Sequence, residues 1–208
     1  MEANYHTPDL FRYSLNSFIR AAKEIPQILS MELQNHHAYQ SDFKSLINSL
    51  DANALLSVLH TKRNFIVHRG MLEVLSKGSV GTTEGRGIKI SIPFPVVPHE
   101  STQEAYERFK EVCRKDKFIR SLAGPDCDSW LMIRREWKIP DFPDKELLEL
   151  SVDAWRLVGE VISQIVVKLG GDKLDLSFSC THELEKIRTI EFSQKEFFKS
   201  VDGGEINA

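Results

Sequence analysis

The residues best suited to chemistry lie in one short segment, Arg63-Asn64-Phe65-Ile66-Val67-His68, which carries a guanidinium, an amide and an imidazole. An imidazole exchanges protons near neutral pH, and a guanidinium can hold two phosphate oxygens at once. Together these groups suit phosphodiester cleavage without a metal ion. By chance alone, a chain of this composition should contain roughly 0.4 Arg–His pairs at a fixed spacing, so the pattern has weight only in its context.

That context is a predicted helix, which Asp51 caps and which runs from Ala52 to about Arg69, with Gly70 as its stop. With Leu55 as the centre of its apolar stripe, the predicted core-facing residues are Leu55, Val58, Leu59 and Ile66. His60, Asn64 and His68 recur every four residues on the opposite side, so we expect a polar row that points away from the core. Arg63 can wrap toward this row, and Lys62 and Arg69 flank it.

The segment Leu59–Gly70 resembles the signature of HEPN domains, in which Arg is followed by a polar residue, three variable residues and His. The stretch Phe11–Phe18 also looks like the first helix of some bacterial members. The resemblance covers the first seventy residues best and residues 144–169 in a general way, while residues 71–143 match nothing. It implies a mainly α, up-and-down helical bundle that commonly forms a homodimer, with two Arg–His motifs facing each other across one cleft.

What the resemblance implies for function is a metal-independent endoribonuclease without a cofactor. Arg63 would stabilise the scissile phosphate, His68 would be the acid–base group, and Asn64 would orient them; His60, Lys62 and Arg69 are the expected substrate-binding groups. The RNA 2′-hydroxyl would be the nucleophile. A toxin or phage-defence effector fits this activity, together with an antitoxin or defence-system partner protein. Gly70 stands where members controlled by a nucleotidyltransferase partner often carry Tyr, which puts regulation by tyrosine modification there in doubt.

Other interpretations of the same residues stay open. Arg63, Asn64 and His68 could instead form a solvated helix face or a structural cluster in a non-catalytic HEPN-like module that binds RNA, a nucleotide or a partner protein. The formal net charge of −3 offers no overall attraction to a polyanion, so RNA would need a local basic patch. We interpret Trp130, Trp137 and Trp155 as core anchors, with an RNA contact of Trp137 beside Arg134 and Arg135 as the alternative.

The remaining pattern predicts one domain over residues 1–200, with an irregular, β-containing insertion at about 71–143 and a flexible tail at 201–208. A helix begins near Pro8 and is expected to kink or restart at Pro26. The glycines of residues 78–87 predict a surface loop, followed by a strand at 88–92. Further helices are predicted after the capping box at Ser101 and from Asp144 to Leu169, then a strand at Leu174–Phe178 and a capping box at residues 193–196.

Composition places the chain among globular proteins, since 41% of its 208 residues are hydrophobic and 27% are charged. No apolar run reaches the roughly 18 residues of a membrane span, and the first residues have no signal-peptide pattern, so we expect a cytoplasmic location and no membrane contact. Cys113, Cys127 and Cys180 are widely spaced, which favours reduced thiols over disulfides or a metal site.

Overall fold

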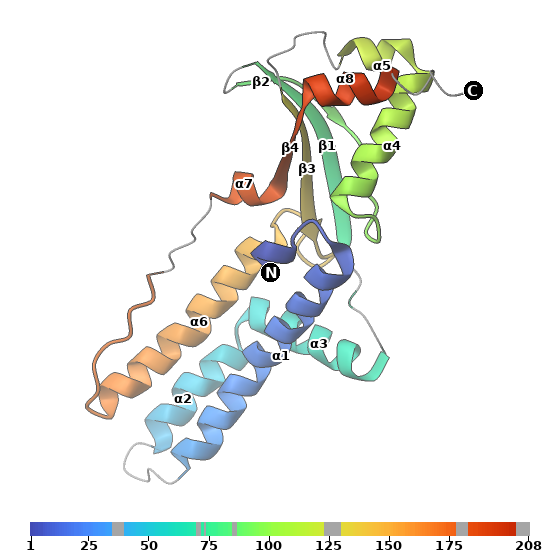
Figure 1. The fold of residues 1–208 in the computed structure, drawn as a ribbon. Helices are drawn as coiled ribbons and strands as arrows, with labels where there is room; N and C mark the ends of the chain where they lie inside the picture. The colour runs from blue at the N-terminus through green and yellow to red at the C-terminus, as the bar shows by residue number, and fades with distance from the viewer. Residues whose placement is uncertain are drawn as a thin grey trace. The chain divides into compact units, whose positions relative to one another are not determined.

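A computed structural model describes residues 1–34, 40–69, 72, 74–84, 87–122, 130–177 and 183–202; within α3 it does not describe the side chains of residues 65–69. The chain divides into two compact units (Figure 1). We call the first the helical unit, which comprises Arg12–Glu73 and Ile139–Cys180. The second is the sheet unit, formed by Glu2–Phe11, Val74–Lys138 and Thr181–Ala208.

This architecture corrects the predicted fold class. The prediction of a mainly α, up-and-down bundle with a small β insertion is wrong, because the described residues form eight α-helices and a four-stranded antiparallel sheet, which is a mixed α/β fold. Val74–Lys138 supplies three of the four strands and shares a unit with segments from both ends of the chain.

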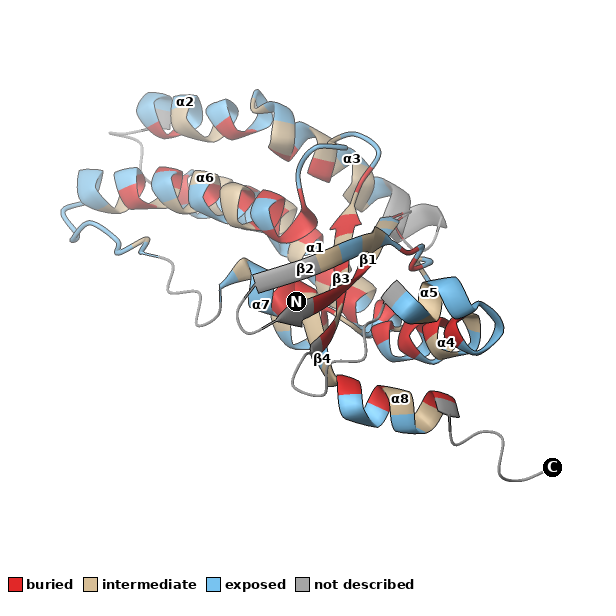
Figure 2. Ribbon diagram, turned by 90° about the horizontal axis from the view of Figure 1, so that it is seen from above, coloured by how far each residue is buried: buried red, intermediate tan, exposed pale blue. Residues whose placement is uncertain are grey.

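The helical unit is built from four long helices. They are α1 (Pro8–Leu33, whose first four residues belong to the sheet unit), α2 (Gln40–Asp51), α3 (Ala54–Arg69) and α6 (Leu147–Lys168). α2 packs against α3 and α6, and Figure 2 shows buried and exposed residues alternating along α6, as its apolar spacing predicts. Two details differ from expectation: α1 continues as one helix through Pro26, and Asn53 caps α3 in place of Asp51.

The sheet unit has strand order β2-β1-β3-β4, with all neighbouring strands antiparallel. The strands are β1 (Leu75–Glu84), β2 (Gly87–Pro93), β3 (Trp130–Lys138) and β4 (Thr189–Ser193); the helices are α4 (Thr102–Lys115), α5 (Lys117–Leu122), α7 (Leu184–Arg188) and α8 (Gln194–Asp202). α4 and α8 pack on one face of the sheet over a core that includes Phe109, Leu131, Ile133 and Phe197. The capping box predicted at Ser101 is confirmed. The Ser101 hydroxyl accepts a hydrogen bond from the backbone amide of Glu104, and the Glu104 carboxylate accepts one from the backbone amide of Ser101.

β1 shows why a glycine-rich stretch was mistaken for a surface loop. Gly78 and Gly81 lie within this strand, paired with Arg135 and Met132 of β3. A Cβ atom on Gly78 would lie 2.8 Å from the carbonyl oxygen of Phe94, so the close approach of that segment requires glycine. The strand is therefore defined by its neighbours, because its own side chains lack a clear apolar alternation.

β3 lies in the middle of the sheet and alternates between the two faces. Its inward residues are Leu131, Ile133, Arg135 and Trp137, and all four are fully buried. Trp137 is thus a core anchor as predicted, and its burial overturns the alternative of an RNA contact. Trp155 is 38% exposed and is not a core anchor, whereas the side chain of Trp130 lies outside the described part of the structure.

The chain after α6 also departs from expectation. The strand predicted at Leu174–Phe178 is absent over the described residues 171–177, because this stretch lies along α6 and pairs with no strand. Instead, the Leu174 amide donates to the Ser163 hydroxyl at 3.1 Å, and Leu176 packs over Gly159. The capping pattern at residues 193–196 marks the start of α8, as predicted, and α8 includes Val201 and Asp202. The rest of the tail, residues 203–208, falls outside the described residues.

The structure bears in part on the predictions about the cysteines and about membrane-spanning segments. Cys113 is a buried free thiol, and its burial raises its pKa to about 11, while Cys127 and Cys180 fall in parts of the chain that the structure does not describe. None of the helices in the described ranges combines the length and the apolar character needed to cross a membrane.

Candidate functional site on helix α3

The buried face of α3 is rotated relative to the sequence prediction. Leu56 and Leu59 are buried, whereas Leu55 and Val58 are only half-buried. Arg63 follows Leu56 and Leu59 at the spacing of one helical face, so it lies on the core side of the helix. Asn64 is exposed, as predicted, and His60 lies between the two sides.

The Arg63 guanidinium is half-buried and loosely held. Its side chain is 27% exposed, with one terminal nitrogen 3.5 Å from Asn64 Oδ1 and the other 3.9 Å from Glu24 Oε1. Both distances are at the long limit of a hydrogen bond or ion pair. Its Nε–H is covered and has no hydrogen-bond partner among the described residues. Arg63 therefore keeps donors that the described fold does not use.

His60 is held by two charged residues at one edge of its ring. Lys23 Nζ lies 3.2 Å from His60 Nδ1, and Asp51 Oδ1 lies 3.5 Å from the same atom. Burial, then the charge of Lys23, lowers the pKa of His60, while Asp51 opposes this shift. The imidazole is therefore neutral at pH 7. Since an ammonium can only donate, Nδ1 accepts from Lys23, which leaves the proton on Nε2.

His60 Nε2–H resembles Arg63 Nε–H in its surroundings. It is covered, and no acceptor within the described ranges reaches it. A buried donor without an acceptor costs about 1–3 kcal/mol, so such groups call for a ligand, an ion or a water molecule. His60 and Arg63 lie one turn apart on α3, and both orphaned atoms are donors. An acceptor-only group such as a phosphate oxygen would complement this pair.

The structure places the other predicted site residues unevenly. The Lys62 ammonium, which was expected to bind substrate, instead forms an ion pair of 2.6 Å with the Asp141 carboxylate. The side chains of His68 and Arg69, the predicted acid–base group and a predicted substrate contact, lie outside the described part of the structure. Among the predicted site residues it brings Arg63 next to Asn64, and it pairs His60 with Lys23 and Asp51.

Sequence reasoning missed the partners of these residues. Lys23 and Glu24 come from α1, and Asp51 is the last residue of α2. From the sequence alone, these three residues are expected to be ordinary solvated charges on amphipathic helices. Their contacts with α3 depend on how the helices pack. A signal was present in α1, where a Lys-Glu pair directly follows the buried Ala22, but nothing in the sequence specified its partner.

Metal ligation has no candidate among these residues. Within the ranges that the structure describes, no group of three or more His, Cys, Asp or Glu side chains is placed to hold a metal ion. Comparisons of the chain with protein-family models, curated proteins and solved structures found no match. The likeness to HEPN domains therefore rests on the residues of the α3 segment and the start of α1.

Proposed function

We propose that this protein is a metal-independent endoribonuclease of the HEPN kind, with its site on α3. The observation that carries the proposal is the state of Arg63, whose guanidinium has only long contacts and a covered, unused donor. Arg134, Arg135 and Arg188 also have a covered Nε–H without a partner, but their terminal nitrogens have partners within 3.2 Å, whereas those of Arg63 have only long contacts. An arginine with spare donors beside a neutral histidine is suited to an oxyanion, and the phosphodiester of RNA is such a ligand.

The chemistry assigned to the site is transesterification. Arg63 holds the non-bridging oxygens of the scissile phosphate, and Asn64 orients the guanidinium through its side-chain oxygen. His68 takes the proton from the RNA 2′-hydroxyl, whose oxygen attacks phosphorus. The bond between phosphorus and the 5′-oxygen breaks, the leaving oxygen takes a proton from water, and the protonated His68 releases its proton to solvent. The products are a 2′,3′-cyclic phosphate and a 5′-hydroxyl. DNA lacks this nucleophile and is not a substrate.

The proposal includes a homodimer. Positions 63 and 68 of a regular α-helix are separated by about 140° around its axis, so one helix does not hold both residues on one face. A second copy that faces the first would supply the missing group from the opposite direction. RNA is the substrate of this cytoplasmic effector, which fits a toxin or phage-defence role with an antitoxin or defence-system partner.

A second candidate function has its own supporting observation. Arg63 lies on the core side of α3, His60 is only 11% exposed, and Asp141 occupies Lys62. These features favour a non-catalytic HEPN-like module, in which the α3 cluster binds RNA, a nucleotide or a partner protein without cleaving anything. The two functions differ in whether His68 is needed for chemistry.

Cleavage of a labelled, mixed-sequence RNA in EDTA tests the proposal. Wild-type protein should cut and leave cyclic phosphate ends, and His68→Ala should cut at least about a hundredfold more slowly, the low end for loss of an acid–base group. Arg63→Lys should also cut poorly, because an ammonium does not reproduce the planar fork. A 2′-deoxy substitution at the cut site should abolish cutting there.

The matched control is His99→Ala, which removes an exposed histidine of the sheet unit and should leave the rate unchanged. Equal activity of wild type and His68→Ala, or products with 3′-hydroxyl ends, would contradict the proposal. Absence of cleavage by the wild type, together with RNA binding that Arg63→Lys weakens, would favour the non-catalytic module.

A further inference from the structure

The sheet unit carries a concentration of positive charge where α4 ends and α5 begins. Between Lys110 and Arg120 the chain has five cations and two acids, in a protein whose formal net charge is −3. The cations are Lys110, Arg114, Lys115, Lys117 and Arg120. Arg114 also donates to the Ser200 carbonyl oxygen at 2.8 Å, which brings this corner next to Lys199 of α8. We call Arg114, Lys115, Lys117, Phe118 and Lys199 the basic corner.

The two acids of this segment are already engaged by local structure. Glu111 pairs with Arg114, three residues later on α4. Asp116 Oδ1 accepts from the backbone amides of Phe118 and Ile119, at 2.9 and 3.1 Å, and so caps α5. In contrast, the side chains of Lys115 and Lys117 are exposed and form no ion pair or hydrogen bond with any other described residue. Their charge faces solvent.

Part of this charge has a structural explanation. Arg114 and Lys115 lie in the last turn of α4, where cations stabilise the negative end of the helix dipole. That explanation does not extend to Lys117, which begins α5, where a positive charge is unfavourable. It does extend to Lys199, which lies in the last turn of α8. Of the four cations of the basic corner, Lys117 is the one that the helix dipoles do not explain.

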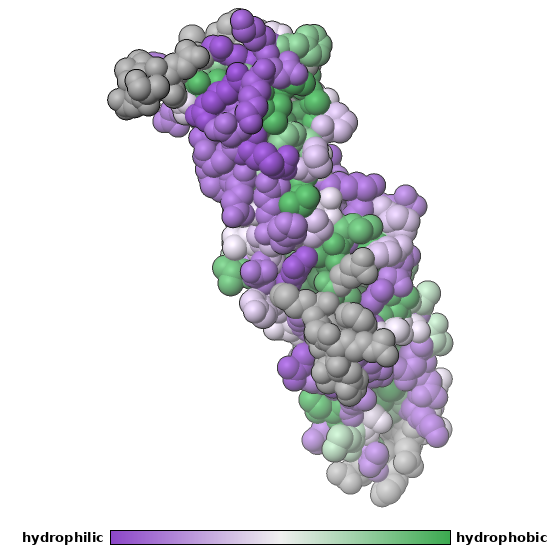
Figure 3. Space-filling model, turned by 90° about the vertical axis from the view of Figure 1, so that its right-hand side faces the viewer, coloured by the Kyte–Doolittle hydropathy of each residue, from purple (hydrophilic) through white to green (hydrophobic). Residues whose placement is uncertain are grey.

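An exposed aromatic ring lies among the cations. Phe118 is 68% exposed, although a phenylalanine has no polar atom that would favour water. Its neighbour Ile119 packs against the core, so α5 turns its apolar residues in two directions. Figure 3 faces this side of the unit, where hydrophilic side chains surround smaller hydrophobic areas. Proteins that bind single-stranded nucleic acid combine cations along the phosphate backbone with aromatic rings on which the bases stack.

We propose that the basic corner is a binding site for single-stranded nucleic acid, in which Lys115, Lys117 and Lys199 contact phosphates and Phe118 stacks on a base. The site is separate from α3 and does not depend on cleavage there. Because phosphate contacts and stacking do not require a 2′-hydroxyl, single-stranded DNA should bind as well as RNA. The basic corner would attract a polyanion locally, although the formal net charge of the whole chain is −3.

The test is fluorescence anisotropy with a labelled thymidine 20-mer, which the proposed chemistry at α3 does not cut. The double variant Lys115→Glu/Lys117→Glu should bind at least about tenfold more weakly. Its plot of log affinity against log salt should be shallower by about 1.4, since each phosphate contact on a single strand contributes about 0.7. Phe118→Leu keeps an apolar side chain but loses stacking, and should weaken binding about fivefold without changing the slope.

The matched control is Lys44→Glu/Lys173→Glu, which makes the same charge change at two exposed lysines of the helical unit. It should leave the salt slope unchanged. No binding of the 20-mer by the wild type, or equal weakening by both double variants, would overturn the inference. So would binding to anionic phosphatidylserine vesicles in place of the 20-mer. Because the probe resists cleavage, these outcomes are independent of whether the protein proves to be a ribonuclease.

Discussion

Two arginines, one in each unit, are both withdrawn from solvent, yet the fold treats them differently. Arg135 of β3 is fully buried; it donates to the carbonyl oxygens of Glu100 and Val97 at 2.6 and 3.1 Å, and its guanidinium lies 3.7 Å from the centre of the Trp137 ring. The guanidinium of Arg63 in α3 has no hydrogen bond or ion pair shorter than 3.5 Å among the described residues. The first arginine is held at several points, and the second is held loosely.

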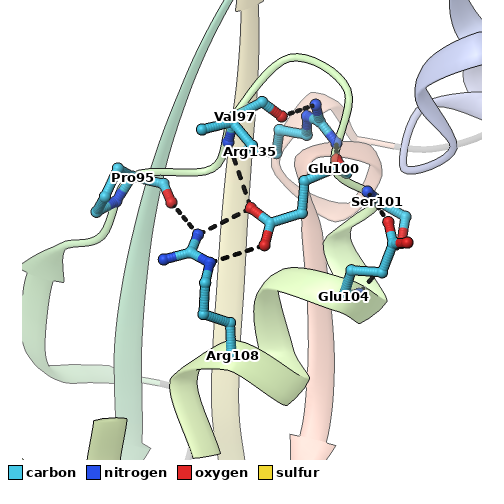
Figure 4. A network of polar contacts seen from close by, with 7 residues as sticks. All are labelled: Pro95, Val97, Glu100, Ser101, Glu104, Arg108 and Arg135. Atoms are coloured by element: carbon cyan, nitrogen blue, oxygen red, sulfur yellow. Dashed lines mark hydrogen bonds and ion pairs between the residues drawn. The ribbon is translucent and has the colours of Figure 1, made fainter. Parts of the chain in front are cut away.

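The surroundings of Arg135 extend this contrast. Figure 4 shows the loop before α4 folded around charged groups, with Arg108 bridging the Glu100 carboxylate and the Pro95 carbonyl oxygen. The Arg108 hydrogen bond lowers the pKa of Glu100. In this network Arg135 donates to the carbonyl oxygens of Val97 and Glu100, which lie in a loop and are not paired by a strand. Both arginines have a covered Nε–H without a hydrogen-bond partner among the described residues, so they differ in their terminal nitrogens, which have partners at 2.6 and 3.1 Å in Arg135 and only at 3.5 and 3.9 Å in Arg63.

The largest effect should come from removing the well-held arginine. Arg135→Met leaves the carbonyls of Val97 and Glu100 without their charged donor, so the sheet unit should lose about 3 kcal/mol or more. Urea unfolding followed by circular dichroism, with amide exchange in β3, measures this loss. Arg134→Met is the matched control on the open face of the same strand and should cost less than about 1 kcal/mol. Similar losses for both variants would show that the buried contacts of Arg135 contribute no more than those of an arginine on the open face.

A smaller effect should come from acid acting on His6, which joins three parts of the sheet unit. Its Nε2–H donates to the Ile187 carbonyl at 2.7 Å, so Nδ1 accepts from the Thr102 hydroxyl at 2.9 Å. Burial is the main cause that lowers the His6 pKa to about 4, with a smaller contribution from the charge of Arg135. The unfolded chain therefore binds the proton first as the pH falls.

The sign follows from that order. The stability that neutral His6 contributes is fully present above pH 6.5 and is lost as the pH falls toward 4, by about 2 kcal/mol between pH 7 and pH 5. Unfolding free energies measured across this range should show the decline. A His6→Asn variant should be less stable at pH 7, and its stability should change less over the same range. A slope equal to that of the wild type would show that other groups cause it.

The sequence predicted most of the helices and little of the sheet, for physical reasons. α1, α3, α4 and α6 carry apolar residues at helical spacing, and such patterns are readable within one segment. β1 owes its existence to pairing with β3, and Arg135 lies where an apolar residue would be expected. The structural roles of Arg135 and Gly78 depend on neighbours that are distant in the sequence, so they could not be predicted from their own segments.

The candidate site was predictable in part for the same reason. The Arg63-Asn64 pair and the position of His60 could be read from α3 alone. Leu59 is buried as expected, but Leu55 and Val58 are only half-buried, and Leu56 is buried in their place. That rotation depends on neighbouring helices, as does the contact of Lys23 with His60. Periodicity identifies an amphipathic helix more reliably than it identifies the centre of its buried face.

The smallest effect on stability should come from the loosely held arginine. Arg63→Met replaces a guanidinium that has a covered, unpaired donor with an apolar chain of similar length, so the unfolding free energy should change by less than about 1 kcal/mol in either direction. Arg156→Met, at an exposed position of α6, gives the baseline for such a change. RNA cleavage or binding by Arg63→Met should nonetheless fall by at least about tenfold. A loss near that of Arg135→Met would mean that the fold depends on both arginines alike, and the spare donors of Arg63 would then carry no argument for a ligand.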